Sequence, residues 1–268
     1  VMYMEMAIRP SSHLNGTIKH PEDVLELVTD LKKSMESKYP IKIGINVHSS
    51  STKDDPIQYR QNAELALKYR DKGVCGYAML QKDIPANAYE YFRSTFDFLK
   101  HHNMKVVMTA GSVDVNTITN AIHTAGAHRI SGAFSLHQSP GLLNYIADHQ
   151  IPIELGLTPK FEHHVAGIRT FAGNPIRLLF DNHCITTICS FHNTLTPSQS
   201  RIDGLYNVVK ECNFSVSEVL KVLQYGFQHN FQSYPERTKL AAEAWTQSSK
   251  ILNQKGFQYF HKKYYMPY

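Results

Sequence analysis

The chain has 268 residues, of which 42% are hydrophobic, and its 28 Lys and Arg against 23 Asp and Glu give a formal net charge of +5. This length and composition indicate one globular domain over residues 1–268 with a large core, and they exclude a disordered or low-complexity chain. The basic residues are scattered apart from Lys262 and Lys263, which argues against nucleic acid as a partner, and no apolar run approaches the ~18 residues of a membrane span.

Short apolar runs alternate with longer segments of helical periodicity over about residues 1–190, as in repeated βα units with a parallel sheet. Strands are expected at Val1–Ile8, Ile41–His48, Gly73–Leu80, Lys105–Thr109, Arg129–Ala133, Ile151–Leu155 and Cys184–Ser190. Helices are expected at Pro21–Tyr39, Asp55–Lys72, Ala88–His101, Asn116–Ala125, Pro140–Asp148 and Pro175–Asn182, and the chain is expected to be wholly helical, as a set of C-terminal helices, from about Gln199 to Asn253.

The seven expected strands fall one short of the common closed parallel barrel, which has eight. We therefore expect an α/β fold, a (β/α)8 TIM-type barrel followed by C-terminal helices, whose first strand lies upstream of Val1 or comes from another chain. An open doubly wound sheet ranks second, because no Gly-rich phosphate loop follows any of the expected strands.

Cysteine usage bears on the compartment. The four cysteines are too few for a disulfide framework and favour a reducing, intracellular location, whereas the sequons at Asn15 and Asn213 keep secretion open. The tail from Lys255 to Tyr268 is aromatic and basic; docking on this protein or a neighbour is favoured over stacking on single-stranded nucleic acid.

Five motifs in order along the chain resemble those of the adenosine deaminase family, a branch of the metal-dependent amidohydrolases. The opening Tyr3–Pro10 is similar to Y-x-E-x-R-x-x-P, with Ala7 in place of Arg, and Thr109–Ser112 is similar to H-A-G-E. The other three are Arg129–Ala133 for R-I-G-H-G, Ile151–Thr158 for I-P-x-E-x-C-P-x-S, and Asn174–Asn193 for H-P-x-x-x-L-x-x-x-G followed by V-T-x-N-T-D-D-P.

The resemblance implies that the reacting groups of this family have been replaced. Thr109 stands where the family has a metal-binding His, and Ser112 stands where it has the Glu proton donor. Gly132 replaces the catalytic His and Phe191 replaces the metal-binding Asp, while the first-strand H-x-H would lie upstream of Val1. We therefore expect no catalytic residue of the family type, no metal site and no zinc cofactor.

A relocated site is the competing interpretation. His48, His137 and His192 all fall near the end of an expected strand, where barrel active sites lie, and three histidines could hold a metal. We favour the interpretation that histidines in a chain with 15 of them reach this face by chance, and we assign the pairs His101–His102 and His163–His164 to loops or helix ends.

Three functional hypotheses follow from the resemblance. The first is an inactive deaminase-like barrel that acts as a structural or interaction subunit with other proteins. The second is a regulatory protein that binds a purine nucleoside or nucleotide without chemistry, with candidate pocket residues Glu5, His48, Thr109, Gly111, Ser112 and His192. The third is an active hydrolase with a relocated site, in which replacing His48 or His192 by Ala abolishes activity.

Overall fold

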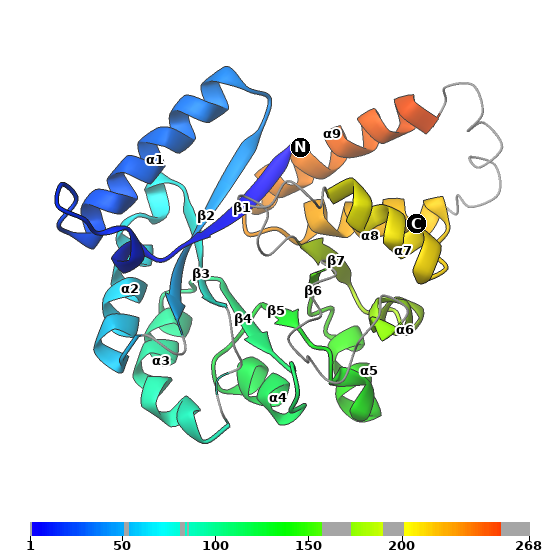
Figure 1. Cartoon of the computed structure of the whole chain (residues 1–268), viewed down its shortest axis with the longest axis horizontal. Helices are drawn as coiled ribbons and strands as arrows, with labels where there is room; N and C mark the ends of the chain where they lie inside the picture. Colours follow the sequence, from blue (N-terminus) through cyan, green and yellow to red (C-terminus); the bar gives the residue numbers. More distant parts are fainter. Residues whose placement is uncertain are drawn as a thin grey trace.

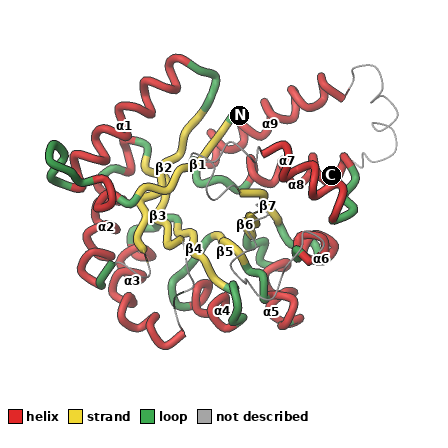
Figure 2. The backbone as a smooth tube through the Cα atoms, in the orientation of Figure 1, coloured by secondary structure: helices red, strands yellow, loops and turns green. Residues whose placement is uncertain are grey.

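A computed structural model describes residues 2–50, 54–80, 84, 86–156, 173–189 and 201–252 of the chain. Its centre is a curled, seven-stranded parallel sheet in which spatial order follows chain order, and helices surround it on the outside (Figures 1 and 2). The strands are β1 (Tyr3–Ile8), β2 (Lys42–Ser50), β3 (Val74–Leu80), β4 (Val106–Ala110), β5 (Arg129–Gly132), β6 (Ile153–Gly156) and β7 (Thr186–Cys189).

The α/β class and the TIM-type architecture are confirmed. Every adjacent pair of strands is parallel, and β1 and β7 form the two edges of the described sheet. The arc of strands is therefore a barrel that stays open by one strand, as the count of βα units predicted.

The helices begin and end close to the predicted positions in the βα part of the chain. They are α1 (Pro21–Lys38), α2 (Pro56–Lys68), α3 (Arg93–His101), α4 (Asn116–His123), α5 (Pro140–Asp148) and α6 (Ile176–Asp181). Short 3-10 turns are η1 (Pro10–His13), η2 (Arg70–Lys72), η3 (Ala86–Phe92) and η4 (Leu136–Gln138). The predicted helices at Asp55–Lys72 and Ala88–His101 are thus each part α-helix and part 3-10 turn.

The C-terminal region, predicted to be helical from about Gln199 to Asn253, is helical in the structure. The structure has three helices there, α7 (Arg201–Glu211), α8 (Val216–Gln228) and α9 (Tyr234–Leu252). The first break has a local cause, because Asn213 adopts a left-handed conformation (φ 55°) and Ser215 starts α8 with a reciprocal capping box to Glu218. The second break, at residues 229–233, is decided by contacts with the barrel interior that are described below.

Alternation along β2 shows how each strand has two different faces. Ile45 and Val47 belong to the main core beneath the helices, together with Tyr59 of α2. Asn46 and His48 point the other way, into the barrel interior, where Asn46 donates to Glu5 of β1. The polar residues at alternate positions of β2, 46 and 48, therefore lie inside the barrel. Within the described ranges, none of the helices is long and apolar enough to cross a membrane.

Candidate functional site

The C-terminal ends of the strands carry the residues that the motifs single out. Thr109 of β4 pairs with Ser131 of β5, and the next step of the register pairs Ala110 with Gly132. Thr109 is partly buried and Gly132 is buried, so these two positions lie on neighbouring strands at one end of the barrel. Active sites of parallel barrels lie at this end.

The turn after β4 is closed around Gly111 and leaves no free space there. The Gly111 N–H donates to the Thr117 hydroxyl (2.7 Å), and the Gly111 carbonyl accepts from the Ser135 N–H (2.8 Å). Gly111 has φ +73°, and a Cβ at this position would lie 2.4 Å from Cδ1 of Ile118. Glycine at this position therefore allows the left-handed turn and the close packing of Ile118. The adjacent Ser112 is partly buried.

His48 is held against the neighbouring strand. Its side chain is buried, and its Nδ1 lies 3.2 Å from the Ala78 carbonyl oxygen and 3.4 Å from the Leu80 N–H nitrogen. Burial lowers the pKa of His48, which favours a neutral ring. His137 is exposed beyond β5, with Nδ1 2.9 Å from the Phe134 carbonyl oxygen. His192 and Phe191 lie outside the described residues.

A buried ion pair, not anticipated from the sequence, lies above β1 and β2. The Arg9 Nε donates to both carboxylate oxygens of Asp54, at 3.0 and 3.1 Å, and Asp54 also accepts from the Ser50 N–H at 2.7 Å. The Asp54 side chain is fully buried. Both charges act on the pKa of His48, which places the pair beside this histidine.

Among the described residues, the side chains at positions 109, 112 and 132 do not form a zinc-binding set. Threonine and serine hydroxyls at positions 109 and 112 are poor ligands for zinc, and Gly132 offers no side chain. In the described part of the chain no three His, Cys, Asp or Glu side chains are grouped so that they could hold a metal ion.

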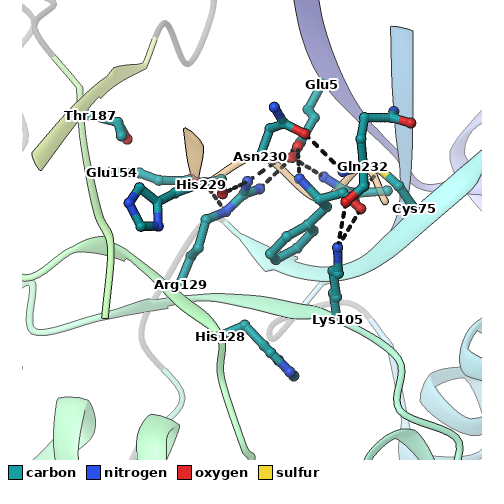
Figure 3. Close-up of polar contacts among 12 residues, drawn as sticks. Glu5, Cys75, Lys105, His128, Arg129, Glu154, Thr187, His229, Asn230 and Gln232 are labelled. Carbon is teal, nitrogen blue, oxygen red and sulfur yellow. Dashed lines mark hydrogen bonds and ion pairs between the residues drawn. The ribbon is translucent and has the colours of Figure 1, made fainter. Parts of the chain in front are cut away.

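A second polar cluster lies deeper in the barrel, around Arg129 (Figure 3). The Arg129 guanidinium forms ion pairs with Glu5 of β1 and with Glu154 of β6, the latter at 2.8 Å between Nε and Oε1. Glu5 also accepts from Tyr3, from Asn46 and from the Phe231 N–H (2.6 Å). The Glu5 carboxylate is therefore bound within a polar network near the N-terminal ends of the strands.

The pKa values of the two carboxylates are shifted in opposite directions. Burial alone would raise the pKa of Glu5, but the Arg129 charge and the hydrogen bonds to its carboxylate lower it to about 2. For Glu154, burial outweighs the attraction of Arg129 and the pKa is raised. Arg129 therefore favours the ionised form of Glu5 more strongly than that of Glu154.

The turn between α8 and α9 packs against this network at the N-terminal end of the strands. Phe231 stacks on the Arg129 guanidinium (3.6 Å from Cζ to the ring centroid), and the His229 carbonyl accepts from Arg129. Lys105 donates to the carbonyls of Phe231 and Gln232, both at 2.8 Å. Gly76 of β3 permits this close approach, because a Cβ there would lie 2.5 Å from the Phe231 ring.

A sequence model of the family described as adenosine deaminase matches residues 1–248. The chain belongs to the adenosine deaminase family.

The family includes relatives of very different length. A probable adenosine deaminase of Dictyostelium discoideum is 38% identical over 261 residues, which is 97% of this chain but 33% of that protein. An adenosine deaminase of Clostridium acetobutylicum is 23% identical over 235 residues, or 86% of this chain and 67% of that protein. The chain thus spans about a third of the Dictyostelium relative and about two thirds of the Clostridium one.

Solved structures show the same fold at low identity. A zinc-bound amidohydrolase from Burkholderia ambifaria has a TM-score of 0.80 at 12% identity, over 94% of this chain and 70% of its own. The N6-methyl-AMP deaminase of Arabidopsis thaliana has a TM-score of 0.77 at 18% identity, over 93% and 74%.

The network around Arg129 was not predicted from the sequence of this adenosine deaminase-family chain. One signal was available in the sequence. Arg129 is a charged residue at the start of an apolar strand, and Glu5 and Glu154 are charged residues within two other strands. Lys105 and the turn at 229–232 carried no such signal, because their roles depend on where the C-terminal helices dock.

Stability should fall on mild acidification because of His229. Burial, followed by the charges of Arg237 and Arg129, lowers its pKa to about 4. Its ordinary value is about 6.5, so the unfolded chain binds the proton first; the stabilising contribution is complete above about pH 6.5 and is lost as the pH falls toward 4. We expect His229→Gln to flatten the decline in unfolding free energy between about pH 7 and about pH 5, as measured by urea denaturation.

Part of the decline should persist in that variant, because burial also lowers the pKa of His48 and His128. Glu5 acts in a lower window, between its ordinary value of about 4.5 and its folded value of about 2. An identical pH profile for the parent protein and His229→Gln would contradict the assignment.

Proposed function

We propose that this chain is a catalytically inactive adenosine deaminase-family barrel that serves as a structural or interaction subunit with other proteins. The observation that carries the proposal is the set of side chains at the C-terminal strand ends. Thr109, Ser112 and Gly132 lie where the family motifs have a metal-binding His, a proton-donating Glu and a catalytic His.

These residue types cannot supply the chemistry of hydrolytic deamination. That reaction needs an activated water and groups that exchange protons near neutral pH. A serine or threonine hydroxyl does not titrate in that range, and glycine has no side chain. His48 is buried with its Nδ1 against the backbone of β3, and we assign no proton-transfer step to it.

The purified protein tests the proposal. We expect less than stoichiometric zinc by metal analysis and no conversion of adenosine to inosine, with the Clostridium acetobutylicum adenosine deaminase as the positive control. Stoichiometric zinc together with adenosine turnover would refute the proposal. Loss of such turnover in His48→Ala or His192→Ala would assign it to a relocated site.

A second candidate function is purine nucleotide binding without chemistry. It is favoured by the solved structures of similar fold that hold IMP and GMP, each with a TM-score of 0.78. A thermal-shift panel of adenosine, inosine, IMP and GMP tests it, because a ligand at a hundredfold excess over Kd adds about 2.7 kcal/mol of stability. The absence of a shift with all four compounds would leave the purely structural role.

A further inference from the structure

Two basic side chains meet at the turn between α8 and α9, near the N-terminal ends of the strands. Lys105, the residue before β4, donates to the Gln232 carbonyl at 2.8 Å (Figure 3). Arg237 lies in the first turn of α9, and its N–H donates to the Ser233 carbonyl at 2.9 Å. The Lys105 ammonium and the backbone of Arg237 are thus bound to the carbonyls of two consecutive residues.

The charges of these two side chains are not balanced. The third cation of this region, Arg129, is paired with both Glu5 and Glu154. Across the ranges that the structure describes, neither Lys105 nor Arg237 forms an ion pair with a carboxylate. Within those ranges the turn is therefore next to two positive charges that lack a counter-charge.

The two cations repel each other in a partly buried setting. Both residues are partly buried, and burial followed by the charge of Arg237 lowers the pKa of Lys105. The same two causes, in the same order, lower the pKa of His229 in the turn. The Arg237 charge therefore acts on both of these neighbours. An anion held beside Lys105 and Arg237 would offset this repulsion.

Hydrogen-bond donors remain available for such an anion. The Lys105 ammonium has three N–H donors, and two of them go to the carbonyls of Phe231 and Gln232. The Arg237 guanidinium lies 5.7 Å from the centroid of the Tyr234 ring and makes no side-chain hydrogen bond to the described residues. Helix α9 also begins here, and the N-terminus of a helix carries partial positive charge.

We propose that Lys105, Arg237 and the N-terminus of α9 form a binding site for a phosphate group. Two cations without a counter-charge match a phosphate, which carries about −1.5 to −2 near neutral pH, better than they match a carboxylate. The planar guanidinium also suits two parallel hydrogen bonds to phosphate oxygens. The phosphate is either the free inorganic ion or a monoester on a larger ligand, and both present the same oxygens.

This site is separate from the region that carries the proposed function. Lys105 and the turn lie at the N-terminal ends of the strands, whereas Thr109 and Gly132 lie at the C-terminal ends. Phosphate binding here therefore stands or falls independently of any activity at the C-terminal ends.

Isothermal titration calorimetry with sodium phosphate at constant ionic strength tests the proposal. We expect saturable binding by the parent protein and binding at least about tenfold weaker in Arg237→Gln, which loses charge-assisted hydrogen bonds. The matched control is Lys239→Gln, which removes one positive charge from the same helix. The Lys239 side chain is 77% exposed, so its loss should leave the phosphate affinity unchanged. Lys105→Met should also weaken binding, and circular dichroism checks that both site variants retain the fold.

Two further ligands separate the possible sources of the phosphate. A tighter affinity for N-acetyl-O-phosphoserine amide than for inorganic phosphate would support the site and assign it to a monoester, and the reverse order would support it and assign it to the free ion. Acetate that binds as tightly as phosphate would overturn the proposal. No phosphate binding to the parent protein, or equal weakening by Arg237→Gln and Lys239→Gln, would overturn it as well.

Discussion

Replacing Arg129 by Met is expected to lower the free energy of unfolding by about 3–5 kcal/mol, because it leaves two buried carboxylates without their cation. Arg129 is buried and pairs with both Glu5 and Glu154. Removing one partner of a buried ion pair costs more than the pair contributes, since the remaining charge keeps its desolvation penalty. Urea denaturation at neutral pH measures the change.

Two further variants keep this prediction testable if Arg129→Met does not fold. Arg129→Lys keeps the charge but loses the forked geometry, and we expect a smaller loss. Adding Glu5→Gln and Glu154→Gln to Arg129→Met should recover part of the stability, because no buried charge is then left unpaired. The control is Arg93→Met, whose ion pair with Glu90 is exposed and whose loss should leave the stability almost unchanged. Equal effects at positions 129 and 93 would contradict the role of the network.

Replacing Phe231 by Ala is expected to cost about 3–5 kcal/mol, the usual range for a buried aromatic residue truncated to Ala. The Phe231 ring is buried and stacks on Arg129, and the backbone N–H of Phe231 donates to Glu5. The loss therefore combines a cavity with a weakened cation–π contact. Because Phe231 joins the turn between α8 and α9 to the barrel, hydrogen exchange should accelerate in those helices before the central strands.

The matched control is Tyr234→Ala, three residues further along the chain. Tyr234 is 72% exposed, so its truncation should change stability by less than about 0.5 kcal/mol. Phe231→Leu should fall between the two, because it keeps part of the apolar volume. If Phe231→Ala is no more destabilising than Tyr234→Ala, the turn does not anchor the C-terminal helices.

The two ends of the barrel interior therefore differ in kind. The N-terminal end holds Arg129, Glu5 and Glu154 in one ion-pair network, and the turn between α8 and α9 adds the His229 carbonyl to it. The C-terminal end of the strands holds Thr109 and Gly132, on the neighbouring strands β4 and β5.

Much of the fold could be predicted from local patterns. The strand at Arg129 and the helix at Pro140–Asp148 follow from an apolar run and from a cap followed by proline, and these signals lie within a few residues of each other. The positions of the breaks between the C-terminal helices were not predicted. The second of them depends on the contact of residue 231 with Glu5, 226 positions away.

The sequence by itself determined the α/β class, the number of βα units in the chain and the motifs that place it among the adenosine deaminases, because periodicity and motif order are local properties. Only the tertiary structure decided that Glu5 belongs to an ion-pair network and that the space beside Gly111 is filled by Ile118. It also decided that Leu27, Leu31 and Met35 of helix α1 stay exposed. Each of these depends on which side chain from a distant element occupies the adjoining space, and no local pattern encodes that.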